Sequence, residues 1–472
     1  MTAPTRTPKS FDRSIVEGPI PRAVWKLAWP TMLQNVLGGL QGIVDHVMVG
    51  RYVGFTGNAA IGVAWQIFLV VIVFIASLFT GMGVLVARFA GANDPEKVNR
   101  TVYQAFITAG ALSLGVLAPI GYVLSPSLLG LVNATPEVQA EALPYLRIMF
   151  VFSLGMLVFF MLGGALRSAG DARTPLRYGI ALTALNIVLN IVFIRGLGPI
   201  PAFGTAGAAM GTVTAGAILS VVALHRLFFS HRWVVQFHRG MRLSPDWWII
   251  RSLFRFGIPA GIQGVAMNIG GVILLRFIGS LARSAEAQAA YAVGYAELFS
   301  LITWTSAGLM GAAAAVAGQN LGAGRPDRSL HGVHVAALIG LGVAVTVGAA
   351  FLAIPRTLLG FFGMDDPVVA DLGVQLLGFL SVSGLFVTVA LAYTGGLQGT
   401  GDTKSPLYIS IVSQLIVPLG MCGVIDHFGT LQADHIWLAI VLGHVTRATL
   451  SVTRFRQGRW RDIKVEIEPA SA

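Results

Sequence analysis

Charged residues and cysteine are both scarce in this chain of 472 residues. Only 11% of its residues are Asp, Glu, Lys or Arg, whereas a soluble domain carries about 25%. The chain is also 55% hydrophobic, with a mean hydropathy of +0.74, and this combination indicates a membrane protein. The single Cys422 lies in an apolar run, which excludes an intramolecular disulfide and a cysteine-based metal cluster.

Several motifs that would identify an enzyme or a pump are also missing. The sequence has no Walker A motif, nucleophile elbow or His-rich cluster, so we expect neither ATP-driven transport nor an enzyme. The first 21 residues are polar and basic and have no short apolar core before a cleavage site, so they predict a cytoplasmic tail and no cleaved signal peptide. We assign the net charge of +11 to cytoplasmic loops and exclude a nucleic-acid partner.

Long apolar runs fill most of the remaining sequence. A spanning helix needs about twenty apolar residues, and about twelve runs meet that length. We therefore predict an all-α membrane protein. The predicted spans are 22–50, 57–88, 98–124, 138–166, 174–195, 204–229, 247–278, 286–320, 328–355, 368–397, 405–425 and 434–453.

Lys and Arg alternate between the loops that these spans define. With the N-terminus inside, the inner loops and inner tail are rich in basic residues, and the outer connection 125–137 has none. Basic residues concentrate in cytoplasmic loops, so we predict that both termini are cytoplasmic and that the protein lies in the plasma membrane (the inner membrane of a bacterium). The basic residues on the predicted inner side are Lys97, Arg100, Arg167, Arg173, Arg177, Arg232, Arg239, Arg242, Arg325, Arg328, Lys404, Arg454, Arg456, Arg459, Arg461 and Lys464.

One short polar stretch occurs twice and reveals an internal duplication. LRSAGDARTPL begins at Leu166, and LQGTGDTKSPL begins at Leu397, 231 residues later. Six spans per half return each half to the same side, so we predict two parallel six-helix lobes related by a pseudo-two-fold axis along the membrane normal. The predicted divisions are a tail at 1–21, an N-lobe at 22–230, a linker at 231–246, a C-lobe at 247–454 and a tail at 455–472.

The repeated Asp and two prolines have structural interpretations. Asp171 and Asp402 each precede a Thr-Pro or Ser-Pro pair, which is typical of a helix cap with Pro in the first turn. Pro30 and Pro259 lie inside predicted spans. Because Pro removes a backbone hydrogen bond, both are candidate hinges.

Asp45 is the strongest candidate for ion chemistry in the N-lobe. Gln34, Gln41 and Asp45 fall on one helical face, and a carboxylate within a span should either take a proton or hold a cation. Asn186, Asn190 and Thr212 reach a similar depth in later helices. Carboxylate, amide and hydroxyl oxygens together suit Na⁺. In the alternative, Asp45 pairs with Arg51 or a neighbouring helix, and the two Asn residues only hydrogen-bond helices together.

Glu297 is the carboxylate placed well inside a predicted C-lobe span. It lies beside Tyr295, and Gln263 and Asn268 on the preceding span are expected nearby. A carboxylate among aromatic rings could hold a lipophilic cation or act as a second proton carrier. It could equally bond a neighbouring helix. We group Glu297, Tyr295, Asn268, Gln263, Gln34 and Gln41 as a candidate substrate or second proton site.

These motifs together resemble the multidrug and toxic compound extrusion (MATE) family. The signs are Pro30 followed by the run VDHVMVG that contains Asp45, a Gly-Ala-Gly turn at 322–324, and the two Leu-x3-Gly-Asp stretches. The likeness extends from about residue 20 to 455. It implies a two-lobe antiporter that exports organic cations or other xenobiotics in exchange for Na⁺ or H⁺ by alternating access, with no cofactor. We expect a monomer.

The resemblance also assigns roles to individual residues. Asp45, Asn186 and Thr212 fall on positions that line the family's N-lobe cation site, and Glu297 falls where many members have Glu. One subgroup has a second Asp where this chain has Asn190, so exchange of protons between paired acids is in doubt here. The alternative function is a flippase of lipid-linked precursors from the same wider superfamily, whose members tend to have two more helices and a cationic central cavity.

Overall fold

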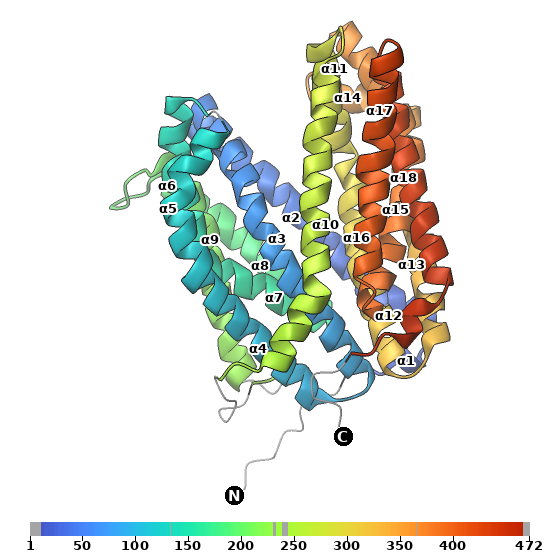
Figure 1. The fold of residues 1–472 in the computed structure, drawn as a ribbon. Coiled ribbons are helices and arrows are strands. Elements are labelled where there is room, and N and C mark those ends of the chain that lie inside the picture. Colours follow the sequence, from blue (N-terminus) through green and yellow to red (C-terminus); the bar gives the residue numbers. More distant parts are fainter. Residues whose placement is uncertain (1–10, 133, 230–232, 238–243, 365, 466–472) are drawn as a thin grey trace, which may run out of the picture. The chain divides into compact units, whose positions relative to one another are not determined.

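The computed structural model describes residues 11–132, 134–229, 233–237, 244–364 and 366–465, with the backbone alone at 69–76. The predicted tails and the predicted linker fall partly outside these residues. The first half contains α1 (Ser14–Glu17), α2 (Ile20–Tyr52), α3 (Phe55–Gly91), α4 (Pro95–Leu112), η1 (Ser113–Leu117), α5 (Ala118–Leu131), α6 (Pro136–Val151), α7 (Ser153–Ser168), α8 (Arg173–Arg195) and α9 (Gly204–Phe229) (Figure 1). The second half contains α10 (Trp247–Gly279), α11 (Ser284–Tyr291), η2 (Ala292–Leu298), α12 (Ser300–Gly322), α13 (Pro326–Ala353), α14 (Pro355–Gly360), α15 (Pro367–Thr400), α16 (Lys404–Ile411), η3 (Val412–Ile416), α17 (Val417–Phe428), α18 (Ala433–Arg456) and η4 (Arg459–Asp462).

The described helices confirm an all-helical membrane protein. Nine helical stretches are long and apolar enough to cross a membrane, and the pair α6 and α7, bent by 55°, makes a tenth. Helices α2 and α3 have 33 and 37 residues, so each reaches about 50 Å or more at 1.5 Å per residue. The described part of the chain therefore holds ten to twelve membrane-crossing helices.

The predicted span boundaries agree with the observed helices to within three residues, with one exception. The third span was predicted to end at residue 124, but its helix continues to Leu131 through Pro126. The outer connection predicted at 125–137 is therefore shorter than expected. The 55° bend lies at Phe152, between α6 and α7, and no sequence signal predicted it. Pro30 and Pro259, the predicted hinges, lie within α2 and α10, which both continue past them.

Three of the spans contain a π-helical segment. These are η1 between α4 and α5, η2 between α11 and α12, and η3 between α16 and α17. π-helical turns are rare and occur often at functional sites. Segment η2 carries Tyr295 and Glu297, two residues of the predicted C-lobe site.

The chain divides into two compact units, and the division cuts through two helices. Unit 1 has Leu37–Ile258 as its main part, and unit 2 consists of Ser14–Val36 and Pro259–Lys464. The first part of α2 thus belongs to unit 2, and the first part of α10 belongs to unit 1. The sequence instead places the lobe boundary in the linker 231–246. The six-helix lobes remain a prediction of the duplication, and the division between the compact units falls within α2 and α10.

Glycines explain how these helix ends are held. In unit 2, a Cβ on Gly308 of α12 would lie 2.5 Å from Met32 Cα, and in unit 1 a Cβ on Gly81 of α3 would lie 2.0 Å from the Leu253 carbonyl oxygen. Only glycine lets the backbones approach this closely, as is usual between membrane helices. In unit 2, Arg325 and Arg328 also donate to the carbonyl oxygens of Val16 and Gly18, at 2.8 and 2.6 Å.

Residues 233–237 of the predicted linker are buried and mostly apolar, whereas Ser244 and Pro245 of the same linker are exposed. Trp233 to Phe237 are each less than 9% exposed. The backbone N–H of Gln236 donates to Asn99 Oδ1 at 2.9 Å, and the N–H of Phe237 donates to the Leu227 carbonyl oxygen at 3.0 Å. Residues 233–237 therefore pack within unit 1, because their side chains are buried and their backbone is bonded to Asn99 of α4 and Leu227 of α9.

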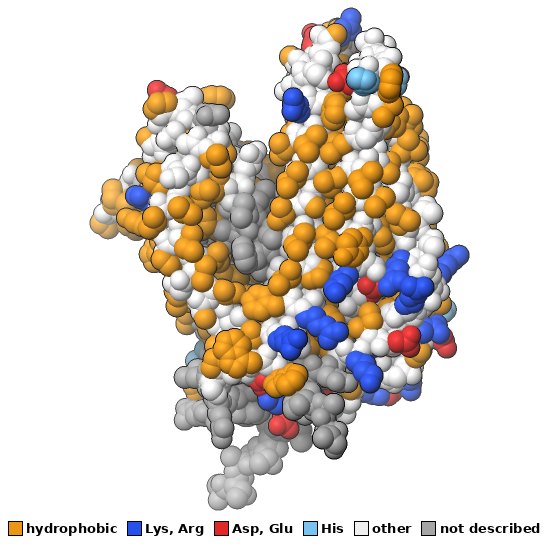
Figure 2. All heavy atoms as spheres, in the orientation of Figure 1, with side chains coloured by type: hydrophobic (Ala, Val, Ile, Leu, Met, Phe, Trp, Pro, Cys, Tyr) orange, Lys and Arg blue, Asp and Glu red, His pale blue; other side chains and the backbone are white. Residues whose placement is uncertain are grey.

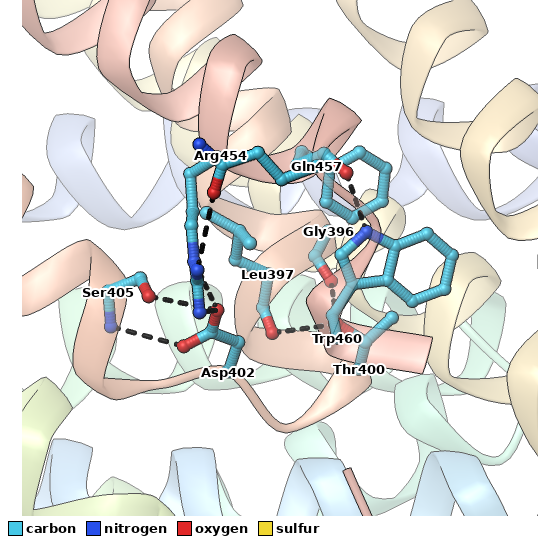
Figure 3. Close-up of polar contacts among 9 residues, drawn as sticks. Gly396, Leu397, Thr400, Asp402, Ser405, Arg454, Gln457 and Trp460 are labelled. Atoms are coloured by element: carbon cyan, nitrogen blue, oxygen red, sulfur yellow. Dashed lines mark hydrogen bonds and ion pairs between the residues drawn. The ribbon is translucent and has the colours of Figure 1, made fainter. Parts of the chain in front are cut away.

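Asp402 in the second repeat makes the contacts of a helix cap (Figure 3). Its Oδ1 accepts from the backbone N–H of Ser405 at 3.2 Å and its Oδ2 accepts from the Ser405 hydroxyl at 2.9 Å. Arg454 of α18 donates from Nε to the same Oδ2 at 2.9 Å. In the first repeat, Asp171 accepts equivalent bonds from Thr174, at 3.1 and 2.8 Å. Both repeated stretches therefore stabilise the first turn of the helix that follows.

Surface charge is uneven along unit 2. Figure 2 shows Lys and Arg side chains gathered near one end of this unit, with hydrophobic side chains along most of its visible length. The apolar stretch fits a surface in contact with lipid, and the basic end fits a membrane–water interface.

Candidate functional site

Four residues predicted for the N-lobe cation site lie together in unit 1. Asp45 comes from α2, Asn186 and Asn190 from α8, and Thr212 from α9. Asn186 and Asn190 are four residues apart, so both point from the same face of α8, and both are fully buried. We call this set the Asp45 cluster.

A chain of side-chain hydrogen bonds connects the Asp45 cluster. Asn190 Nδ2 donates to Asp45 Oδ1 at 2.6 Å and to Asn186 Oδ1 at 3.3 Å. Asn186 Nδ2 donates to the Thr212 hydroxyl at 3.1 Å, and that hydroxyl donates to the Ala208 carbonyl oxygen at 3.1 Å. The Asn190 amide thus uses both of its hydrogen atoms within the cluster, and the Thr212 hydroxyl uses its hydrogen on the backbone.

One acceptor in the Asp45 cluster is left over. Asn190 Oδ1 is buried and has no hydrogen-bond partner among the described residues. It lies against Gly211 of α9, where a Cβ would be only 2.0 Å from it. A buried acceptor without a donor is costly, and a cation beside Asp45 would satisfy it. The residues present therefore fit a monovalent hard cation such as Na⁺, held by carboxylate, amide and hydroxyl oxygens.

Residues that the sequence did not single out surround the Asp45 cluster. Tyr145 of α6 is 5% exposed and lies within electrostatic range of Asp45. His46 Nδ1 is 2.5 Å from Asn58 Oδ1 of α3. His46 could have been noticed as the neighbour of Asp45, whereas Tyr145 has no signal in the sequence because its helix comes about one hundred residues later. The predicted Gln41 accepts a 3.2 Å bond from the Thr183 hydroxyl.

Among the described residues, those predicted for the second site form no hydrogen bonds with one another. Gln263 is buried and donates to the Ser410 hydroxyl at 2.7 Å, and its Oε1 accepts from Gln398 at 3.2 Å. Asn268 is exposed and donates to the Gly264 carbonyl oxygen of its own helix. Among the described residues, no hydrogen bond or ion pair links Glu297 to either of them, and Gln34 is only half-buried. Gln263 therefore links helices, which was one of the alternatives for polar residues in a span.

Aromatic rings stack on one another along the helical segment that contains Glu297. Tyr291 and Tyr295 have ring centroids 4.9 Å apart and nearly parallel planes, and the Tyr295 and Phe299 centroids are 5.4 Å apart. Trp437 of α18 extends the stack, with its ring 6.2 Å from Tyr291. We call Trp437, Tyr291, Tyr295 and Phe299 the aromatic row of unit 2.

Two polar residues of α18 were missed altogether. His444 is 3% exposed, and its Nδ1 lies 2.5 Å from the Ser383 hydroxyl of α15. Its ring centroid is 5.9 Å from that of Phe299. Arg447, one turn further along, is also 3% exposed. The sequence signal for both residues is a His and an Arg in an otherwise apolar span.

Comparison with known proteins identifies the fold and the family. The MatE family model matches residues 30–192 and 259–422, in two halves. The chain is similar to the "Probable multidrug resistance protein NorM" of Deinococcus radiodurans, at 29% identity over 93% of this chain and 96% of that protein. It is 26% identical to the protein of the same name from Thermotoga maritima, over 92% of each chain.

Solved structures agree with the family model. An outward-facing structure of a MATE-family transporter of the MOP superfamily superposes with a TM-score of 0.88 at 22% identity, covering 97% of this chain and all of that one. A crystal structure of MATE in the straight conformation gives a TM-score of 0.87 with the same identity and coverage. Because the family model spans well over half of the sequence, this chain is a multi-pass membrane transporter that belongs to the MATE family.

Proposed function

We propose that this transporter exports amphipathic organic cations and other xenobiotics in exchange for a cation bound at the Asp45 cluster. The observation that carries the proposal is the buried Asn190 Oδ1, which has no donor among the described residues and lies in the same hydrogen-bonded chain as the Asp45 carboxylate. Curated relatives named as multidrug resistance proteins, including the MdtK protein of Pectobacterium atrosepticum at 24% identity, support the substrate class.

The ion and the substrate exchange through Asp45. In the hydrogen-bonded arrangement, the Asn190 amide neutralises part of the Asp45 charge by donating to it. When Na⁺ binds, it neutralises the Asp45 charge in place of the Asn190 amide, because the cation binds the carboxylate and the free Asn190 oxygen directly. A proton would act differently. Protonated Asp45 becomes a donor, and rotation of the Asn190 amide would let its oxygen accept that hydrogen.

Both coupling ions use the same atoms, so the ion is decided by experiment. The two lobes then rock to open the cluster to one side or the other. We also propose that both termini face the cytoplasm, on the basis of the Lys and Arg distribution. The flippase of lipid-linked precursors stays an alternative hypothesis, and a labelled-lipid flip assay without drug transport would favour it.

The decisive experiment measures ethidium transport in proteoliposomes that contain the full chain. An inward Na⁺ gradient and an inward H⁺ gradient are imposed separately, each with the membrane potential clamped. One of the gradients should drive ethidium movement, and Asp45→Asn should abolish it. Asp371→Asn is the matched control, because Asp371 is exposed and pairs with exposed Arg356 at 2.6 Å. Ethidium movement that neither gradient affects, or that survives Asp45→Asn, would disprove the assignment.

A further inference from the structure

Arg447 of α18 is a buried cation without a counter-ion among the described residues. It is 3% exposed, and its Nε is fully buried without a hydrogen-bond partner there. The five salt bridges found in the described part of the chain involve other residues. A guanidinium inside a span is costly unless an anion balances it. The positive charge of Arg447 is therefore not balanced by an anionic side chain in the described part of the folded protein.

The neighbours of Arg447 on α18 supply hydrogen-bond donors. His444 precedes it by three residues and Ser451 follows it by four, so all three share one helical face. The Ser451 hydroxyl is fully buried and has no partner among the described residues. A guanidinium and a free hydroxyl, with no carboxylate paired to them, form a set suited to an oxyanion.

A second segment brings another unsatisfied hydroxyl to this side of α18. A Cβ on Gly443 would lie 2.7 Å from the Ser413 carbonyl oxygen, so η3 runs directly against the helix one turn before Arg447. The Ser413 hydroxyl is also buried without a partner among the described residues. Segment η3 is π-helical, and such turns are frequent at functional sites.

The aromatic row ends close to Arg447. Tyr295 and His444 both lie within electrostatic range of Arg447, and the His444 ring lies against Phe299. The row thus presents flat aromatic surfaces next to a planar cation. Aromatic rings offset-stack on one another, and a guanidinium binds a carboxylate through two parallel hydrogen bonds.

We propose that Arg447 binds the carboxylate of amphipathic aromatic substrates, whose rings pack against Tyr295 in the aromatic row. This rests on the proposed export function and names a substrate class for unit 2. One carboxylate balances one guanidinium, whereas a phosphate monoester would bring about 1.5 to 2 negative charges. A lipid phosphodiester is disfavoured because Arg447 is buried among helices and does not lie on the lipid-facing surface.

The test compares two probes that differ only in charge at one group. Norfloxacin carries an aromatic carboxylate, and its methyl ester lacks that charge. Binding of each to the purified full-length protein is measured by fluorescence anisotropy. The wild type should bind the acid about tenfold more tightly than the ester or better, and Arg447→Gln should remove this preference while the affinity for the ester stays unchanged.

Two control variants and a mass-spectrometry measurement make the result decisive. Arg447→Lys keeps the charge but not the paired donors, so it should keep part of the preference and show that the site folds. Arg456→Gln, an exposed Arg at the end of α18, should keep all of it. The proposal is overturned if Arg447→Gln weakens acid and ester equally, if it changes neither, or if mass spectrometry finds an anionic phospholipid that is lost with Arg447.

Ethidium transport separates this inference from the proposed function. Ethidium has no carboxylate, so its gradient-driven export tests the proposed function and not the carboxylate-binding role of Arg447. Arg456→Gln should keep this export within about twofold of wild type. A wild-type protein that exports no ethidium would disprove the proposed function, while the difference between the two norfloxacin probes would still be measured.

Discussion

The Asp45 cluster of unit 1 and the polar groups around Arg447 in unit 2 have opposite character. In unit 1, the unsatisfied atom of the Asp45 cluster is the acceptor Asn190 Oδ1, beside a carboxylate. In unit 2, the unsatisfied atoms around Arg447 are its own Nε and the hydroxyls of Ser413 and Ser451. Under the two proposals, the Asp45 cluster receives a cation and the groups around Arg447 receive an anion. A duplicated scaffold can therefore carry two different chemistries.

The repeat register shows how the difference arose at single positions. At the offset of 231 residues, Asn186 and Asn190 correspond to Val417 and Met421, and Arg447 corresponds to Gly216. Each polar group is replaced by an apolar or small residue in the other half. The interhelical packing needs only residues of suitable size, so charge can change in one half without loss of the fold.

The largest expected effect is the loss of ethidium export when Asp45 of unit 1 is replaced. Asp45→Asn should lower gradient-driven ethidium export by about a hundredfold or more, because the carboxylate is the charged ligand of the cation. Transport rates in proteoliposomes check this, and size-exclusion chromatography confirms that the variant is folded. Full activity with Asn at position 45 would mean that unit 1 is not the cation-binding half.

The Arg447→Gln and Asp45→Asn variants together test whether the two units have separate roles. Arg447→Gln should abolish the preference for norfloxacin over its methyl ester, and Asp45→Asn should leave that preference within about twofold, because binding of the carboxylate belongs to unit 2. Equilibrium binding of both probes to both variants is the measurement. If either variant changed both properties to the same extent, the two units would not have separate roles.

A smaller effect should follow from crowding the free acceptor. A Cβ on Gly211 would lie 2.0 Å from Asn190 Oδ1, whereas a Cβ on Gly110 of α4 would meet nothing within 4 Å. Gly211→Ala should displace the Asn190 amide and raise the concentration of coupling ion needed for half-maximal export by about tenfold. Gly110→Ala should leave it unchanged. Equal behaviour of the two alanine variants would remove Asn190 Oδ1 from the cation site.

The smallest expected effect concerns a feature that both halves share. Asp402→Ala removes a cap and the partner of Arg454, so it should lower the free energy of unfolding by about 1 to 2 kcal/mol. Asp371→Ala removes a surface pair with both side chains 67% exposed and should cost about 0 to 1 kcal/mol. Thermal unfolding in detergent compares the two. An export defect in Asp402→Ala greater than its loss of stability would give this repeat a role in transport.

Much of the fold and part of the site could be predicted from residues alone. Apolar runs of spanning length predicted all the helix extents closely except that of the third span, because the bilayer imposes a fixed thickness on every span. The i, i+4 spacing of Asn186 and Asn190 and the depth of Asp45 predicted a shared location. Two features could not be predicted, the bend at Phe152 and the buried stretch from Trp233 to Phe237. Neither has a local sequence signal such as a Pro or a regular spacing of apolar residues.

The sequence by itself determined the helical architecture, the duplication and the identity of the intramembrane acid, since these depend on hydropathy and on patterns along one chain. Only the tertiary structure decided which polar atoms have partners. Within the described residues, Asn190 Oδ1 and Arg447 Nε are left free because of where the neighbouring helices and η3 lie, and a hydrogen bond is made or missed over a few tenths of an ångström. The spacing of residues along the chain does not determine distances this finely. The opposite character of the Asp45 cluster and the groups around Arg447 is therefore seen only in the three-dimensional structure.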